Sequence, residues 1–296
     1  MRTLKRIPEV RAALAERRRM RQSIGFVPTM GALHEGHLSL IRAAAARCEV
    51  VIVSIFVNPT QFSPGEDLER YPRDLASDIE LASDAGADLL FAPEVDEVYP
   101  VGFATTVEVH GLTEVLCGAP ASRGAEHFRG VTTVVAKLLN VVAPHVAFFG
   151  QKDAQQAIVL RRMVADLAFN IEIAIEPTVR DSDGLALSSR NAYLSEAERE
   201  RALAIPRAIS LAGELAATRP LGEAVAAAEN ELRSAGVQPE YVEARHADDL
   251  SVATTWGERP VLIAVAATVG PARLIDNTIL EPRPVTEPTA IGSGVE

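Results

Sequence analysis

Short apolar runs alternate with amphipathic segments through residues 1–177 of this 296-residue chain. Each apolar run has the length of a buried strand, and each amphipathic segment has the spacing of a helix that covers one face of a sheet. Because helices join successive strands, the alternation predicts an α/β fold with a Rossmann-like parallel sheet and helices on both faces. We expect strands at 24–27, 50–57, 88–91, 146–149 and 171–175, and helices at 38–47, 75–85, 132–142 and 154–167.

The pattern changes after Pro177. Helical periodicity and then strand-like runs follow, at 195–218, 221–234, 240–245 and 261–268. Pro206 should kink or divide the first of these helices, and Ser195 with Glu198 fits a capping box at its start. The chain is therefore expected to form a Rossmann-like domain, a smaller C-terminal α+β domain that covers the active site, and a disordered tail, at 1–177, 178–282 and 283–296.

Charge and cysteine content argue against several classes of protein. The formal net charge is −11, so no general basic surface for nucleic acid is expected. The two cysteines, Cys48 and Cys117, argue against a disulfide framework and fit a reducing cytoplasm. The arginine-rich start, 1–22, lacks an apolar signal segment and is expected to form a solvated helix. The longest apolar segment, 131–150, is interrupted by polar residues and a proline, so no membrane span is expected.

The turn after the first expected strand carries His34 and His37 in the pattern His-x-Gly-His. It leads into a helix, and a helix start offers unpaired N–H groups and a positive dipole end to phosphate. The imidazoles add donors that can carry charge near neutral pH. The spacing is typical of adenylyl-transferring enzymes, and neither a Walker loop nor a dinucleotide fingerprint occurs. The alternative interpretation is a glycine-containing turn with two surface histidines.

Two further polar loops should join this turn. Ligands of parallel sheets bind beyond the carboxyl ends of the strands, where 30–37, 58–61 and 150–153 are expected to converge. Lys152 in the third loop is one of only three lysines among 29 basic residues. We therefore interpret it as a specific positive charge rather than general surface charge.

Three segments together resemble the pantothenate synthetase family, the pantoate–β-alanine ligases. They are 30–37, 150–156 and 183–191, with further matches at 58–62, 127–131 and a last strand at 273–277. The resemblance extends over roughly residues 1–282. It implies membership of the nucleotidyltransferase superfamily that includes the class I aminoacyl-tRNA synthetases.

The resemblance implies the reaction and its partners. ATP drives condensation of (R)-pantoate with β-alanine to pantothenate, AMP and pyrophosphate through an enzyme-bound pantoyl adenylate. Mg²⁺ is needed, and members are homodimers in the cytoplasm. Two alternatives remain open: a nucleotidyltransferase that only transfers AMP, and a non-catalytic nucleotide-binding module.

The resemblance also assigns roles to residues. His37 and Lys152 are expected to be catalytic, and Gln61 and Gln156 are expected to bind pantoate and β-alanine. No metal ligand is singled out. The expected ATP-binding residues are Met30, Gly31, Ala32, Leu33, His34, Glu35, Gly36, His37, Gly150, Gln151, Lys152, Asp153, Val179, Leu187, Ser188, Ser189 and Arg190.

Three points stay open at the level of sequence. Asp153 either helps to place the ribose or metal or caps the helix that follows it. Gln155 is a rival to Gln156, and only one of them should point into the site. Cys117 replaces a glutamate that is usual in the family, and the loop after it is longer, so the role of Arg123 is uncertain.

Overall fold

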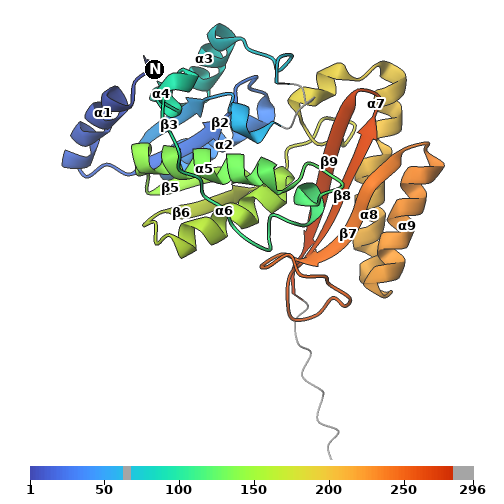
Figure 1. Ribbon diagram of the computed structural model, residues 1–296. Helices are drawn as coiled ribbons and strands as arrows, with labels where there is room; N and C mark the ends of the chain where they lie inside the picture. The colour runs from blue at the N-terminus through green and yellow to red at the C-terminus, as the bar shows by residue number, and fades with distance from the viewer. Residues whose placement is uncertain (63–67, 283–296) are drawn as a thin grey trace, which may run out of the picture.

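The computed structural model describes residues 1–62 and 68–282. Its larger sheet has six parallel strands in the order β1-β4-β3-β2-β5-β6 (Figure 1). The strands are β1 (Arg2–Leu4), β2 (Ile24–Thr29), β3 (Val50–Ile55), β4 (Leu89–Phe91), β5 (Val146–Gly150) and β6 (Glu172–Glu176). The predicted Rossmann-like parallel sheet is therefore confirmed.

Helices bury both faces of this sheet. In β2, Phe26 packs into a core shared with α1, α5 and α6, whereas Val27 packs into a core shared with α2 and α3. Because alternate strand residues point to opposite faces, both sides need apolar residues, which explains the unbroken apolar runs. The helices are α1 (Ile7–Arg19), α2 (Glu35–Arg47), α3 (Leu75–Asp84), the short α4 (Val95–Val98), α5 (Ala125–Val142) and α6 (Ala154–Asp166).

A smaller antiparallel sheet, β7-β8-β9, lies beside the larger one (Figure 1). Helices α8 and α9 pack on one of its faces. On the other face, Leu262 and Ala264 join the core of the larger sheet, so the two sheets share a boundary. The elements are α7 (Glu196–Ala202), α8 (Ala204–Ala216), α9 (Leu221–Ser234), β7 (Gln238–His246), β8 (Val261–Val269) and β9 (Ala272–Leu280).

Strands β2 and β5 are neighbours at the centre of the larger sheet, although β3 and β4 lie between them in the sequence. The chain leaves β2 toward one side of the sheet and later returns to its other side at β5. Such a reversal opens a crevice beyond the carboxyl ends of the two strands. Short 3₁₀ helices carry loops around this crevice: η1 (Pro59–Gln61), η2 (Leu116–Gly118), η3 (Gln151–Asp153) and η4 (Ser189–Tyr193).

Local predictions in the C-terminal part are confirmed. The helix expected at 195–218 is divided between α7 and α8, with Pro206 in the first turn of α8, where a missing N–H costs no helical bond. The Ser195 N–H donates to the Glu198 carboxylate at 2.8 Å, and the Glu198 N–H donates to the Ser195 hydroxyl at 3.4 Å, which completes the capping box.

The structure differs from the predictions in one additional strand and in the start of one helix. Strand β1 is not predicted by the sequence pattern, because three residues carry no periodic signal and their pairing with β4 is distant in sequence. Helix α5 starts at Ala125, earlier than the expected residue 132. The expected tail, 283–296, lies outside the described residues. Within the described ranges, no helix has both the length and the apolar content to cross a membrane.

Candidate active site

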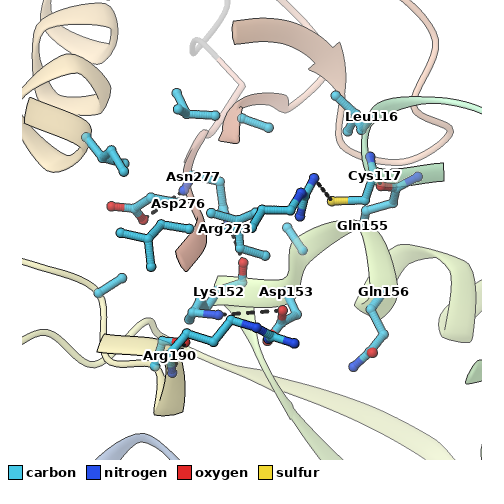
Figure 2. A pocket seen from close by; sticks show the side chains of 18 of the residues that line it. Leu116, Cys117, Lys152, Asp153, Gln155, Gln156, Arg190, Arg273, Asp276 and Asn277 are labelled. Atoms are coloured by element: carbon cyan, nitrogen blue, oxygen red, sulfur yellow. Dashed lines mark hydrogen bonds and ion pairs between the residues drawn. The ribbon is translucent and has the colours of Figure 1, made fainter. Parts of the chain in front are cut away.

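A cavity of about 560 Å³ lies between the carboxyl edge of the larger sheet and strand β9 of the smaller one. Its walls come from η3, η4, β9 and the segment 116–128 (Figure 2). Five basic side chains line it, against the acidic Asp153 and Asp276: Arg70, Arg123, Lys152, Arg190 and Arg273. An acidic chain thus gathers positive charge locally, as binding of an anionic nucleotide requires.

His34 and His37 together form a capping box at the start of α2. His34 is the N-cap of α2, and its Nδ1 accepts from the Gly36 N–H at 3.2 Å. The Nδ1 of His37 accepts from the His34 N–H at 3.3 Å, and the ring centroids are 4.1 Å apart. Since Nδ1 is an acceptor in both rings, each neutral imidazole carries its proton on Nε2. Both rings therefore keep an Nε2–H donor for a ligand.

The fold favours the neutral form of both rings. Burial is the main cause that lowers the pKa of His37 from 6.5 to about 3, and His34 adds to the effect. Burial and the charge of Lys152 lower the pKa of His34, against a smaller opposing effect of Asp153. The expectation that these imidazoles carry charge near neutral pH is therefore wrong here. A Cβ on Gly36 would lie 3.9 Å from the Leu187 Cβ, so the turn lies beside the segment that carries Ser188 and Arg190.

The backbone of the turn is held by a carboxylate that was not predicted. Asp78 of α3 is only 3% exposed and accepts from the N–H groups of Ala32 at 3.0 Å and Leu33 at 2.7 Å. Those N–H groups, like that of Gly36, already have protein partners. The expectation that the turn offers unpaired N–H groups to phosphate is wrong for these three. Asp78 lies on the buried side of α3 together with Ala82. An acidic residue at a helix position that the apolar pattern predicts to be buried could have identified it from the sequence.

The turn after β5 is held by the last strand. The Asn277 side chain donates from Nδ2 to the carbonyls of Gln151 and Lys152, both at 2.9 Å. The Lys152 ammonium lies 3.7 Å from the Asp153 carboxylate (Figure 2). Asp153 occupies the N-cap position of α6, but its side chain makes no capping bond and is 48% exposed. Its carboxylate is thus available to a ligand.

Gln61 is placed by the turn at η1. Its Nε2 donates to the Met30 sulfur at 2.9 Å, and its Oε1 accepts from Asn58 Nδ2 at 3.1 Å. Asn58 is 1% exposed and also donates to the Gly130 carbonyl. A Cβ on Gly130 would lie 2.3 Å from the Thr60 carbonyl oxygen, so α5 approaches this turn more closely than a side chain permits. Asn58 and Gly130 lie in segments that match the family, but their role in positioning Gln61 was not predicted from the sequence.

The rivalry between the two neighbouring glutamines is resolved. Gln155 is 6% exposed and its amide is fully engaged: it accepts from the Cys117 N–H and donates to the carbonyls of Leu112 and Val115. Both glutamines line the cavity, but Gln156 forms no hydrogen bond with the rest of the chain that the structure describes (Figure 2). Gln156 is therefore the one that can meet a ligand.

Of the expected residues in segment 179–190, only Ser188 and Arg190 are among the residues that line the cavity. The Leu187 N–H donates to the Val179 carbonyl at 3.0 Å, and the Ser188 hydroxyl accepts from the Arg190 N–H at 3.3 Å. Ser188 and Arg190 line the cavity, and Ser189 starts η4 between them. Glu35 is exposed and pairs with Arg42, so the structure does not bring its side chain into the site.

A family model described as pantoate-beta-alanine ligase matches residues 2–279. The chain belongs to this family. A pantothenate synthetase of Moorella thermoacetica is 55% identical over 284 residues, 95% of this chain and 99% of that protein. A crystal structure of pantothenate synthetase from Thermus thermophilus has a TM-score of 0.88 at 47% identity and covers 95% of this chain and 100% of that one.

A more distant pantoate–β-alanine ligase has a described ligand state. The enzyme of Francisella tularensis, crystallised in complex with "Beta-gamma ATP and Beta-alanine", has a TM-score of 0.76 at 34% identity and covers 94% of this chain and 97% of that one. The expected fold class, family and ligase activity are thereby confirmed.

The departure from the family pattern at Cys117 has a structural counterpart. Its sulfur lies 3.1 Å from the Tyr241 hydroxyl and 3.5 Å from the Arg273 guanidinium (Figure 2). Arg273 finds a carboxylate instead in Glu240, at 2.7 Å. Arg123 donates to Nε2 of His127 at 3.1 Å, and Nδ1 of His127 donates to the Gln61 carbonyl at 2.7 Å. Arg123 thus contributes to the wall that supports Gln61.

We predict that His37 titrates far below an ordinary histidine. Because folding lowers its pKa, the neutral ring stabilises the native state above pH 6.5, and this contribution is lost as pH falls from 6.5 toward about 3. NMR titration of the imidazole nitrogens should give a midpoint near 3 with the proton on Nε2. The urea-denatured chain is the control and should titrate near its unperturbed value of about 6.5. A native midpoint at 6.5 or above would contradict the prediction.

Proposed function

We propose that this chain condenses (R)-pantoate with β-alanine in two steps, through a pantoyl adenylate at the cavity described above. The observation that carries the proposal is that the His34–His37 turn and the turn that carries Lys152 leave the neighbouring parallel strands β2 and β5 at the same edge of the sheet, where Lys152, Arg190 and Gln156 line the cavity. Family membership over nearly the whole chain supports the choice of reaction. The relative complexed with β-alanine and an ATP compound supports the choice of ligands.

In the first step a pantoate carboxylate oxygen attacks the α-phosphorus of ATP, and pyrophosphate leaves. A carboxylate needs no general base, so the protein contributes position and charge stabilisation. The Nε2–H groups of His34 and His37 donate to phosphate oxygens as neutral donors. Lys152 and Arg190 supply the positive charge that offsets the charge on the leaving pyrophosphate.

In the second step the β-alanine amine attacks the acyl carbon of the mixed anhydride. The bond between that carbon and the phosphate oxygen breaks, AMP leaves, and the amine loses a proton. The anhydride must be kept from water until the amine arrives. The enclosing wall of the smaller sheet, with Asn277 bonded to the turn that carries Lys152, is suited to this task.

One carboxylate beside Lys152, that of Asp153, is compatible with a Mg²⁺ ion bound together with the nucleotide. No group of three acidic, histidine or cysteine ligands occurs within residues 1–62 and 68–282. Mg²⁺ in such sites keeps waters and substrate oxygens and takes only one or two carboxylates, and the exposed Asp153 carboxylate can be one. When bound, the ion would neutralise phosphate charge.

Three further features belong to the same proposal and follow the family pattern. They are a homodimer, a cytoplasmic location, and a division of the chain at residue 177 into an ATP- and pantoate-binding domain and a domain that covers the site. The two described cysteines are buried and unpaired, which is compatible with a reducing compartment.

The reaction order can be tested directly. Enzyme mixed with ATP, Mg²⁺ and pantoate, but no amine, should release pyrophosphate in a burst of about one equivalent, because a water-excluding site holds the adenylate. AMP should appear on addition of β-alanine. Steady AMP release without β-alanine would support the simple transferase, and binding of ATP without turnover would support the non-catalytic module. Absence of pyrophosphate until β-alanine is added would contradict the two-step order.

We predict that Gln156→Ala and Gln155→Ala separate binding from folding. Gln156→Ala should raise the pantoate KM by about tenfold or more, since a lost partner of a buried hydroxyl costs about 1–3 kcal/mol. Its thermal unfolding should match wild type. Gln155→Ala should lower the unfolding free energy, because it leaves the Cys117 N–H and the carbonyls of Leu112 and Val115 without their partner. Equal stability losses in the two variants would contradict this assignment.

We predict that Lys152→Arg disables adenylate formation although it keeps the charge. Lys152 is 22% exposed and sits beside Asp153 and the histidine turn, where a compact ammonium fits between phosphate oxygens. A guanidinium is larger, planar and fixed in its donor directions. The rate of pyrophosphate release should fall by about 10²–10³-fold, with Lys152→Ala as reference and circular dichroism as the folding control. Turnover within about tenfold of wild type would contradict the geometric role.

A further inference from the structure

Two consecutive residues in the turn between β2 and His34 have positive φ angles. Gly31 has φ +84° and Ala32 has φ +51°. A turn that directs successive N–H groups toward a common point makes a concavity that attracts anions. Here the anion is internal: the carboxylate of Asp78 takes the N–H groups of Ala32 and Leu33.

The identity of Gly31 follows from the same arrangement. A Cβ at this position would lie 2.8 Å from Asp78 Oδ2 and 3.0 Å from Ile55 Cγ2. The carboxylate therefore stands where a side chain of residue 31 would be, and only glycine both adopts the φ angle and leaves that space. Asp78 and Gly31 form one structural unit.

The held segment is directly connected to the groups that act on phosphate. Leu33 precedes His34, whose N–H donates to His37 and whose Nδ1 caps the helix. A displacement of the Leu33 peptide would move His34 and turn both Nε2–H donors away together. By contrast, Gln156 lies on α6, away from this turn, and Gln61 is held by Asn58 and by the packing of η1 on α5, with one contact to the Met30 sulfur just before the turn.

We propose that Asp78 is a positioning residue for nucleotide chemistry, which fixes the histidine turn before ATP binds. The proposal rests on the proposed function for its kinetic consequence. It assigns to Asp78 a larger effect on ATP and on adenylate formation than on pantoate recognition, because Gln61 meets this turn only through the Met30 sulfur. Because the carboxylate fills the concavity, it also directs phosphate to the imidazoles rather than to the backbone of Ala32 and Leu33.

The test compares Asp78→Asn with Asp88→Asn. The Asp88 carboxylate accepts from the Val51 N–H at 2.8 Å, at the opposite, amino edge of the same sheet, so the control removes the same charge from the same kind of bond. In Asp78→Asn an amide NH₂ replaces one acceptor and faces an N–H donor. We expect the rate of pyrophosphate release to fall by about 10²-fold, as small displacements of catalytic groups do, with a much smaller change in the pantoate KM. Asp88→Asn should match wild type.

Hydrogen exchange supplies a readout that does not depend on activity. The amide of Ala32 or Leu33 should exchange about tenfold faster or more in Asp78→Asn, while the strand amides of β2 keep their protection. If Asp78→Asn does not fold, Gly31→Ala replaces it, because the added Cβ would displace the Asp78 carboxylate. The same quantities are then measured: the rate of pyrophosphate release and the KM values of ATP and pantoate.

Wild-type kinetics with unchanged exchange would overturn the proposal. An equal rise in the KM of ATP and pantoate would also overturn it, since that pattern indicates a general structural role. Failure of the wild-type enzyme to release pyrophosphate would overturn the ligase function instead, and the exchange measurement would still decide whether Asp78 holds the turn.

Discussion

The pairing of β2 with β5 is the constraint on which the site depends. Gly25 and Phe26 pair with Val146 and Ala147, which brings two segments far apart in the sequence into adjacent positions. The turn with the histidines leaves one strand, and the turn with Lys152 leaves the other. Because the strands are parallel, both turns emerge at the same edge. Gly25 permits this packing on the helix side too, since a Cβ there would lie 3.1 Å from the Cys48 sulfur.

The smaller sheet adds a second constraint through the end of β9. Asp276 binds Arg180 through two bonds, at 2.6 and 2.9 Å, and Asn277 binds the backbone of η3. These neighbours point to opposite sides of one strand. The strand therefore ties the segment that leads to Ser188 and Arg190 to the turn that carries Lys152. Strand β9 thereby holds Lys152, Arg190 and its own Arg273 around one cavity.

Much of the architecture could be predicted from the sequence because it rests on local patterns. Period and length locate the central strands and most helices, and Pro206 marks the division between α7 and α8. The preference for Gln156 over Gln155 came from the family resemblance alone, because adjacent positions at a helix start differ only in what surrounds them. The positioning roles of Asn58, Asp78 and Gly130 were not predicted, for a related reason. Their roles depend on backbone groups of distant segments, and a sequence shows no partner for them.

The reciprocal capping of the histidines has a consequence for how substitutions are interpreted. The His34 N–H orients the ring of His37, and the Gly36 N–H, between the two histidines, orients the ring of His34. Replacing His34 removes the cap of α2 and shifts the peptide that fixes the tautomer of His37. The two residues are thus one energetic unit, and the effects of single replacements should not sum to the effect of the double one. The quantity with a physical meaning is the coupling energy from a double-mutant cycle, and activity lost at either position belongs to the pair.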